Sequence, residues 1–223
     1  GKRLSYLLNL ICAIKEVERV RISSIEITEL DEEFMNTLKN NKKIVDHIHI
    51  PLQTGCDKVL KDMNRKYDME YYFNKIKEIK KIRPNMNITT DVIVGYPTET
   101  EDEFEETLKN IEKLEFGKVH VFPYSKREGT PSALLKDLDN SIKKERVHKL
   151  LNLSLKLENN FLNKHLNKEV EFLPEVYKDN YLIGHTGDYA LVKCKGKENN
   201  LHKIIKTKIT DIKYPYCIGE NHE

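Results

Sequence analysis

The spacing of apolar positions changes partway along the chain. Up to residue 123, short β-branched apolar runs alternate with segments of helical spacing. The expected helices cover residues 4–17, 28–39, 57–63, 69–83 and 98–114, and the expected strands cover residues 19–25, 44–52, 88–94 and 118–122. This alternation predicts a parallel α/β sheet, in which right-handed crossovers bring the carboxyl end of every strand to one rim.

One strand–helix step is especially clear. Ile88–Val94 is apolar and β-branched apart from Asp91, which is typical of a strand buried on both faces. Gly95 ends the run, and Thr98 or Thr100 can then cap a helix whose first turn is acidic. An Asp near the carboxyl end of such a strand lies where parallel α/β folds bind ligands. The other interpretation is an Asp that bonds only to neighbouring backbone amides.

The last third of the chain has a different pattern. Residues 143–165 have the spacing of one long amphipathic helix, and short alternating runs separated by Asn, Asp and Gly turns follow. The runs predict strands near residues 169–173, 181–184, 189–194 and 204–212, which would form a small β-barrel. We therefore expect a partial (β/α) barrel over residues 1–142, a connecting helix over 143–165 and an all-β module over 166–223.

Composition narrows the class of protein. No apolar run approaches the roughly 18–20 residues that span a bilayer, and no signal-peptide pattern is present, so we expect a cytoplasmic protein with no membrane partner. The four cysteines, Cys12, Cys56, Cys194 and Cys217, are far apart in the sequence. This spacing is typical of reduced thiols in a cytosolic protein and not of disulfides or a zinc site. Residues 141–223 hold 15 basic and 11 acidic residues, against 23 and 25 in residues 1–140, which weakly favours an anionic partner for the C-terminal part.

Polar residues follow all four expected strands, so their common rim is the expected site. The candidates are Ser23, Ser24 and Glu26, then His47, His49 and Gln53, then Asp91 and Gly95, and finally His120, Tyr124, Ser125 and Arg127.

Several of these candidates have two interpretations. His47 and His49 face one side of a strand and could bind a metal, but no Cys or Asp at the usual spacing completes a ligand set, so we expect hydrogen-bonded histidines and no metal site. Gly95 suits either close approach by a ligand or a tight turn. Tyr181 and Tyr189 could stack on bases or belong to the core of the all-β module.

A set of motifs in fixed order carries a family resemblance. The motifs are Ser-Ser-Ile-Glu at 23–26, His-Ile-Pro-Leu-Gln-Thr-Gly at 49–55, Met-Asn-Arg-Lys-Tyr at 63–67, Thr-Thr-Asp-Val-Ile-Val-Gly-Tyr-Pro-Thr-Glu-Thr at 89–100 and His-Val-Phe-Pro-Tyr-Ser at 120–125. Over nearly its whole length the chain resembles the radical S-adenosylmethionine methylthiotransferases that modify tRNA. Its tail, with Gly-His-Thr-Gly at 184–187, resembles their RNA-binding TRAM domain. The resemblance implies the branch that acts on N6-threonylcarbamoyladenosine at position 37; sister branches act on isopentenyladenosine in tRNA or on an aspartate of a ribosomal protein.

The resemblance also implies cofactors that this chain cannot hold by itself. The family uses two [4Fe-4S] clusters, one held by Cys-x-x-x-Cys-x-x-Cys, to reduce S-adenosylmethionine, and the four scattered cysteines here offer no such triad. We expect a fragment that binds a tRNA anticodon stem-loop and is inactive alone. A sheet edge left open in such a fragment could pair with a second copy as a dimer.

Roles for individual residues follow from the resemblance alone. Ser24 and Glu26 would face the methionine end of S-adenosylmethionine, Gln53 and Thr54 its ribose or methionine part, and the Val94 and Gly95 backbone its adenine. Asp91, Tyr124 and Arg127 would be the catalytic residues nearer the substrate. Glu99 is one place late for the usual adenine motif and receives no role, and Cys56 is expected to be a tolerated small residue.

Two other functions stay open. One is an RNA-binding protein whose α/β part is a non-catalytic scaffold. The other is an ordinary metabolic barrel enzyme, which would need a nucleophile–base pair that the rim residues do not show.

Overall fold

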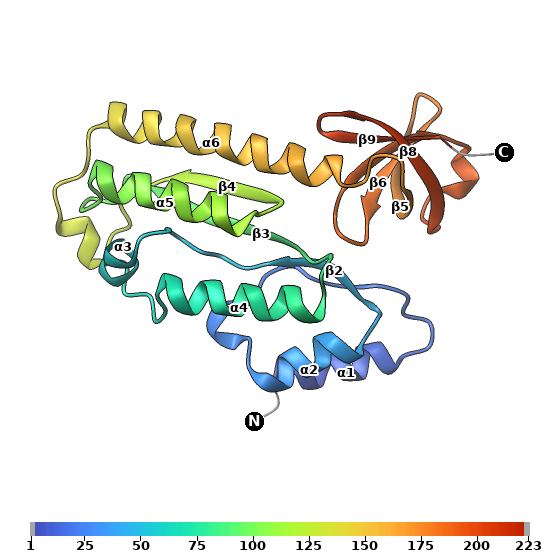
Figure 1. Ribbon diagram of the computed structural model, residues 1–223, viewed down its shortest axis with the longest axis horizontal. Coiled ribbons are helices and arrows are strands. Elements are labelled where there is room, and N and C mark those ends of the chain that lie inside the picture. Colours follow the sequence, from blue (N-terminus) through green and yellow to red (C-terminus); the bar gives the residue numbers. More distant parts are fainter. Residues whose placement is uncertain (1–2, 221–223) are drawn as a thin grey trace.

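The computed structural model describes residues 3–220 and contains two sheets joined by one long helix (Figure 1). The first sheet is parallel and has the order β1 (Val20–Ile22), β2 (Ile44–His49), β3 (Asn87–Val94), β4 (Lys118–Pro123). The second is a closed barrel in the order β5 (Glu169–Lys178), β6 (Tyr181–Thr186), β7 (Leu191–Lys195), β9 (Tyr216–Glu220), β8 (Ile205–Lys213). This architecture confirms the expected fold class of a partial parallel β/α barrel followed by a small all-β barrel.

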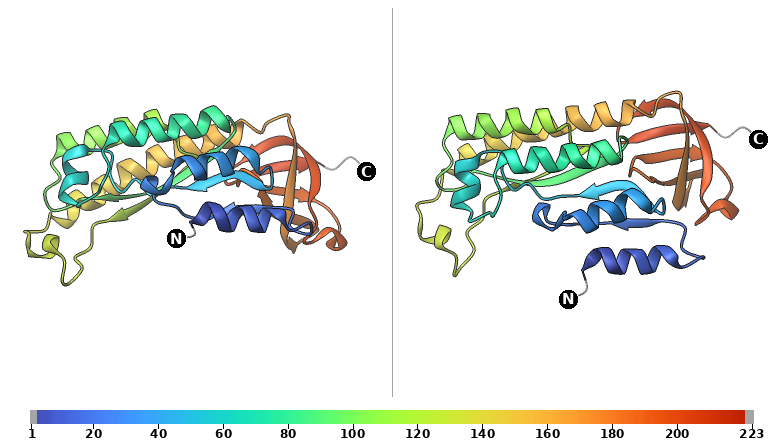
Figure 2. Two further views of the ribbon diagram at one scale, coloured as in Figure 1. Left: turned by 90° about the horizontal axis from the view of Figure 1, so that it is seen from below. Right: turned by 60° about the horizontal axis from the view of Figure 1, so that its bottom comes forward.

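Helices cover one face of the parallel sheet and leave the other open. The helices are α1 (Leu4–Ala13), α2 (Glu32–Asn40), α3 (Asp57–Asp62), α4 (Met69–Ile82), α5 (Glu101–Leu114) and α6 (Asn140–Asn163). Buried aromatic side chains such as Phe34, Tyr72 and Phe104 pack from α2, α4 and α5 against apolar side chains of the strands in one core. Figures 1 and 2 show α6 running beside α5 and ending at the small barrel.

Local sequence signals explain where the helices begin. Thr100 and Glu103 form a capping box at the start of α5, with the Thr100 amide donating to Glu103 at 2.7 Å, so Thr100 and not Thr98 is the cap. The second expected helix begins later than predicted, because the Asp31 carboxylate accepts from the Phe34 amide at 2.8 Å and starts α2 at Glu32.

Several strands differ from expectation: β2 ends at His49 rather than at residue 52, β5 continues to Lys178, and the largest differences concern β1 and β9. β1 has only three residues, because its register with β2 shifts after Val20. β9 was not predicted, since its alternation lasts only five residues and includes Gly219. β9 closes the barrel by pairing parallel to β7 and antiparallel to β8.

The loop between β6 and β7 fastens the small barrel to the end of α6 and to the parallel sheet. Asp188 accepts a hydrogen bond from His165 Nε2 at 2.7 Å, and its carbonyl accepts from the Asn87 side chain at 2.7 Å. The other ring nitrogen of His165, Nδ1, donates to the Phe161 carbonyl at 3.2 Å, so the ring has partners for two protons. Burial would lower the pKa of His165, but the hydrogen bond and charge of Asp188 outweigh it and raise the pKa. Burial would raise the pKa of Asp188, but the hydrogen bond and charge of His165 outweigh it and lower that pKa.

The signs of these two pKa shifts give a pH prediction. The contribution of His165 is complete below its unfolded pKa, about 6.5, and is lost as pH rises through its raised folded pKa. The contribution of Asp188 is complete above its unfolded pKa, about 3.9, and is lost as pH falls through its lowered folded pKa. We expect His165→Gln to lower the free energy of unfolding by about 2 kcal/mol near pH 5.5 and by less at pH 9, measured by urea unfolding.

His148→Gln is the matched control for this prediction, because His148 lies exposed on α6, the helix that ends just before His165. It should leave the stability nearly unchanged at both pH values. An equal loss for His165→Gln at pH 5.5 and pH 9 would contradict the assignment of a charged pair.

Candidate functional site

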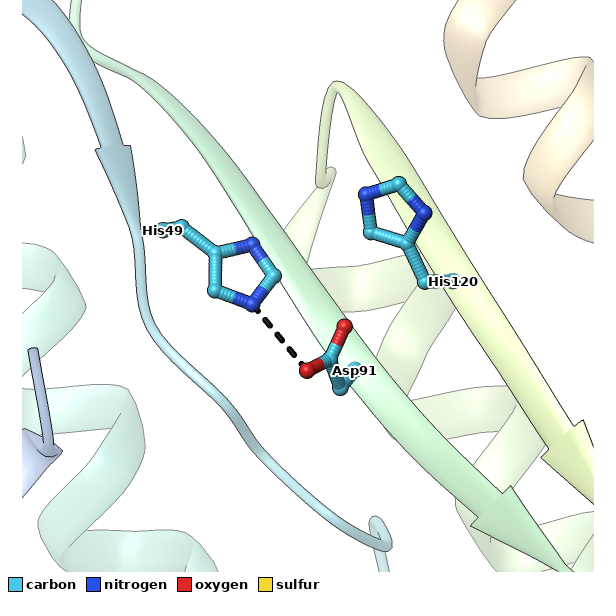
Figure 3. A group of neighbouring side chains, drawn as sticks. All are labelled: His49, Asp91 and His120. Carbon is cyan, nitrogen blue, oxygen red and sulfur yellow. Dashed lines mark ion pairs between the residues drawn. The ribbon is translucent and has the colours of Figure 1, made fainter. Parts of the chain in front are cut away.

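Three polar side chains from three neighbouring strands meet on the open face of the sheet. His49 lies on β2, Asp91 on β3 and His120 on β4 (Figure 3). Asp91 pairs in register with His120, and Thr89, two residues before Asp91, pairs with His49. Because strand residues alternate between faces, this register places all three side chains on one face.

The three side chains are close enough to share a ligand. His49 Nε2 lies 3.3 Å from Asp91 Oδ2, and one ligand atom from each of the three residues lies within 4.8 Å of the others. The His49 and His120 ring centroids are 5.8 Å apart. The His49 side chain is 13% exposed and that of Asp91 34%, so the group is open to a bound molecule. The sequence shows no Cys or Asp at the usual ligand spacing from the histidines. Asp91 supplies a carboxylate from the next strand, where spacing along the chain cannot show it.

A hydroxyl group fixes the orientation of the His49 ring. Thr89 Oγ1 lies 2.9 Å from His49 Nδ1 and 3.1 Å from His47 Nε2. Because a hydroxyl has one proton, Thr89 donates to one imidazole and accepts from the other. The result is a chain of polar contacts from His47 through Thr89 and His49 to Asp91.

Burial keeps two of these histidines neutral. It lowers the pKa of His47 to about 4, with the charge of Arg21 acting in the same direction. It also lowers the pKa of His120, against the opposing charge of Asp91. His47 is therefore a neutral core histidine whose Nε2 contacts the Thr89 hydroxyl, while its buried Nδ1 has no hydrogen-bond partner within residues 3–220.

Tyr189 connects this group to the small barrel. Its ring stacks on His47 at a centroid distance of 4.6 Å and on His185 at 4.2 Å, and the Arg21 guanidinium lies 4.4 Å from the ring centroid. Base stacking and a place in the barrel core were the two interpretations of Tyr189. The structure gives it a third position, at the junction between the barrel and the sheet.

Three of the predicted cofactor residues lie near the open rim. Ser24 and Glu26 are exposed after β1, and Glu26 lies 3.6 Å from Arg65. Gln53 has a positive φ of 73° and extends the sheet, donating its amide to the Asp91 carbonyl at 2.9 Å. Gln53 is thus held beside Asp91.

Two side chains expected at the site, those of Thr54 and Tyr124, turn away from the open face, which corrects their expected roles. The Thr54 hydroxyl lies 3.1 Å from that of Thr107 and is buried against α5. Val94 was expected to offer its backbone to the adenine; its side chain is buried, and its carbonyl accepts from the Tyr124 amide at 2.8 Å. Tyr124 is 9% exposed and packs edge-on against Tyr96 at 5.3 Å, so it belongs to an apolar cluster beneath the rim.

Gly95 is a turn residue that contacts Glu99 and Lys143. Its φ is +75°, its amide donates to Glu99 Oε2 at 2.7 Å, and an added Cβ would lie 2.4 Å from Lys143 Cγ. Glu99 received no role from the sequence. In the structure, the buried carboxylate of Glu99 forms an ion pair with buried Arg146 at 2.8 Å. Burial raises the pKa of Glu99, against the opposing hydrogen bond from Gly95 and the charge of Arg146.

Comparison with known proteins places the chain in a family. The model of the Radical SAM superfamily matches residues 1–111. The threonylcarbamoyladenosine tRNA methylthiotransferase MtaB of Bacillus subtilis is 43% identical over 213 residues, covering 93% of this chain and 47% of that protein. The chain belongs to the radical SAM methylthiotransferase family.

A second relative supports this placement. The tRNA-2-methylthio-N(6)-dimethylallyladenosine synthase of Bacillus subtilis is 38% identical over 209 residues, covering 92% of this chain and 41% of that protein. This member of the methylthiotransferase family therefore spans about half the length of the curated relatives that it matches. Among solved structures, coproporphyrinogen III oxidase (HemN) of Escherichia coli aligns with a TM-score of 0.49 and 20% identity, over 62% of this chain and 32% of that one.

The cysteines of this family member do not fit an iron–sulfur cluster. Within residues 3–220 all four are buried, with Cys12 on α1, Cys56 before α3 and Cys194 and Cys217 inside the small barrel. They cannot supply three clustered thiolates. At the rim, exposed Ser24 and Glu26 and partly exposed Gln53 offer hydrogen-bonding side chains of the kind that a polar ligand such as S-adenosylmethionine requires.

Two further sequence expectations concern Arg127 and membranes. Arg127 is exposed on the loop after β4 and makes no ion pair with any residue between 3 and 220. None of the described helices combines the length and apolar character that crossing a membrane requires.

Gly95→Ala tests the assignment of Gly95 to a structural turn. We expect it to lower the free energy of unfolding by about 1 kcal/mol for the positive φ and by about 1–3 kcal/mol more for the contact with Lys143. Gly129→Ala is the matched control, since Gly129 has a φ of +81° with nothing within 4 Å of an added Cβ. Equal losses in urea unfolding would show that Lys143 does not restrict the position.

Proposed function

We propose that this chain is part of an enzyme that methylthiolates C2 of N6-threonylcarbamoyladenosine at position 37 of tRNA. The observation that carries the proposal is the 43% identity to MtaB across 93% of the chain, because it covers the parallel sheet and the small barrel together. An RNA-modifying role also suits the basic C-terminal part, and we expect the enzyme to act in the cytoplasm.

In this proposal the rim binds the cofactor and the open face binds the substrate base. Ser24, Glu26 and Gln53 hold S-adenosylmethionine at the rim, while Asp91 and Arg127 face the modified base. S-adenosylmethionine, together with the iron–sulfur clusters, would supply the radical chemistry and the methyl group. Since the described cysteines do not form a cluster site, the chain is inactive by itself and works only with cluster ligands from elsewhere in the enzyme.

The two edges of the parallel sheet are consistent with a barrel of which this chain forms only a part. β1 and β4 are the two edge strands of the parallel sheet. Unpaired edges are templates for further strands, so the remainder of the full-length barrel would cover them. Self-association through an edge is expected only for the isolated chain.

The outer face of the small barrel offers a platform for RNA. Lys193 on β7 lies between two aromatic rings, with its Nζ 4.4 Å from the ring centroid of Tyr181 on β6 and 5.6 Å from that of Tyr216 on β9. All three side chains are partly exposed. Aromatic rings stack on unpaired bases and a lysine contacts phosphate, as single-stranded RNA requires. The platform fits the loop of an anticodon stem-loop.

A sister substrate is the second candidate, because the dimethylallyladenosine synthase shares 38% identity with the chain. The discriminating measurement is binding to anticodon stem-loops that carry threonylcarbamoyladenosine, isopentenyladenosine or plain adenosine at position 37. Tightest binding to the first supports the proposal, and tightest binding to the second replaces it with the sister activity. Equal binding to all three would favour an RNA-binding scaffold without a base-recognition site.

Lys193→Gln tests the platform. We expect it to weaken stem-loop binding severalfold for every loop sequence and to reduce the slope of log Kd against log salt by about one, because one phosphate contact is lost. Lys206→Gln removes the same charge from β8, where Lys206 is 63% exposed and paired with Glu169 at 3.5 Å, and should have little effect. Equal effects of both variants would mean that the barrel attracts RNA only through its total charge.

Asp91→Asn and Gln53→Ala test the open face in the full-length enzyme. Each should lower the rate of methylthiolation about 10- to 100-fold, which is the cost of one lost polar contact to a charged or buried group. Mass spectrometry of nucleosides from treated tRNA measures the product. Asp102→Asn, on the exposed first turn of α5, is the control. Unchanged turnover in both variants would remove these residues from the site.

A further inference from the structure

We propose that His49, Asp91 and His120 bind one divalent transition-metal ion of the zinc type on the open face of the parallel sheet. The proposal concerns a mononuclear site without cysteine, distinct from the iron–sulfur clusters of the family, and it does not depend on the proposed substrate.

The geometry is close to that of a metal site. Two ligands about 2.1 Å from a tetrahedral ion lie about 3.4 Å apart. His49 Nε2 and Asp91 Oδ2 already lie 3.3 Å apart, and the ligand atoms of all three residues fall within 4.8 Å of one another. The His120 ring is exposed on the edge strand β4, which leaves room for the change of side-chain rotamer that metal binding requires (Figure 3).

The donor set selects the class of ion. Two imidazoles and one carboxylate suit Zn²⁺, Fe²⁺ or Co²⁺, whereas Ca²⁺ and Mg²⁺ prefer oxygen ligands. Three protein ligands also leave at least one coordination position free, as in catalytic rather than structural sites. That position faces the open side of the sheet, where a water molecule or an oxygen of a bound substrate can occupy it.

The charge balance supports a cation at this position. Within the described chain Asp91 has no Lys or Arg partner, and its ion-pair contact is with His49 alone. The arginines near this face have other contacts: Arg21 lies over the Tyr189 ring and Arg65 lies near Glu26. A metal ion would therefore supply the positive charge that the half-buried carboxylate lacks.

A second layer of contacts presents His49 as a ligand. Thr89 Oγ1 lies 2.9 Å from Nδ1 of His49, so Nε2 is left facing Asp91. With a metal on Nε2, Nδ1–H donates to Thr89, and the Thr89 hydroxyl donates to His47 Nε2, 3.1 Å away. Hydrogen bonds of this kind fix the ring and the tautomer of metal-bound histidines. His47 is buried, and its ring stacks on that of Tyr189, which restricts the position of His47.

The test is Zn²⁺ and Co²⁺ binding to the full chain after treatment with a chelator and removal of any affinity tag. Calorimetry should show one tight equivalent per chain, and Co²⁺ should give the visible absorption of a low-symmetry site with nitrogen and oxygen ligands. His49→Gln and His120→Gln should each weaken binding at least tenfold, and Thr89→Val about 10-fold or more through the lost hydrogen bond. His148→Gln, on α6, should not change it.

A second measurement on the unaltered chain covers the case in which a variant does not fold. Zn²⁺ should shift the imidazole NMR signals of His49 and His120 and leave those of His165 and His202 in place. Binding that persists in the double variant His49→Gln/His120→Gln, or the absence of a tight equivalent in the unaltered chain, would overturn the proposal. Failure of the full-length enzyme to methylthiolate tRNA, with metal binding intact, would instead contradict only the proposed function.

Discussion

The register of β3 is the constraint on which the rest of this structure depends. β3 pairs with β2 on one side and with β4 on the other, and Gln53 adds a further bridge beside Val92. A slip of one residue would turn Asp91 toward the helices and Val92 toward the open face. The buried apolar residues of β3 oppose such a slip, because each would lose its place in the helix-covered core. The hydrophobic core therefore fixes the polar group on the opposite face.

The same register connects the small barrel to the polar group. Thr89 is the neighbour of both His47 and His49, and Tyr189 of the barrel stacks on His47. Thr89, which orients His49, therefore also contacts His47, the residue on which Tyr189 of the barrel stacks. The junction is thus connected to Asp91 by one ring contact, the two hydrogen bonds of Thr89 and the contact between His49 and Asp91.

Most of the fold could be predicted from the sequence, and part of the site could not. Long periodic segments such as α4, and the capped start of α5, follow from local residues alone. The group of His49, Asp91 and His120 needs the pairing of three strands, which spacing along one chain does not give. Tyr124 was expected at the rim because it follows a strand end, and Thr54 because of the family resemblance, but strand alternation no longer applies at either position. The positive φ of Gln53 turns Thr54 toward α5, and Tyr124 finds an aromatic partner in Tyr96.

Contacts near both ends of the helix α6 fix the position of the small barrel relative to the parallel sheet. At one end, buried Arg146 pairs with Glu99, whose carboxylate also accepts the Gly95 amide of the turn after β3. Just past the other end, His165 pairs with Asp188 of the barrel, and Asn87 at the start of β3 donates to the same residue. α6 is therefore tied to β3 near both of its ends. Swinging the barrel away would leave Asp188 without its histidine and would open the stack of Tyr189 on His47. The loss of these contacts opposes such a movement, so the small barrel and the open face keep one geometry. In the proposed function, a loop of RNA bound to the barrel would therefore meet a site whose position is already fixed.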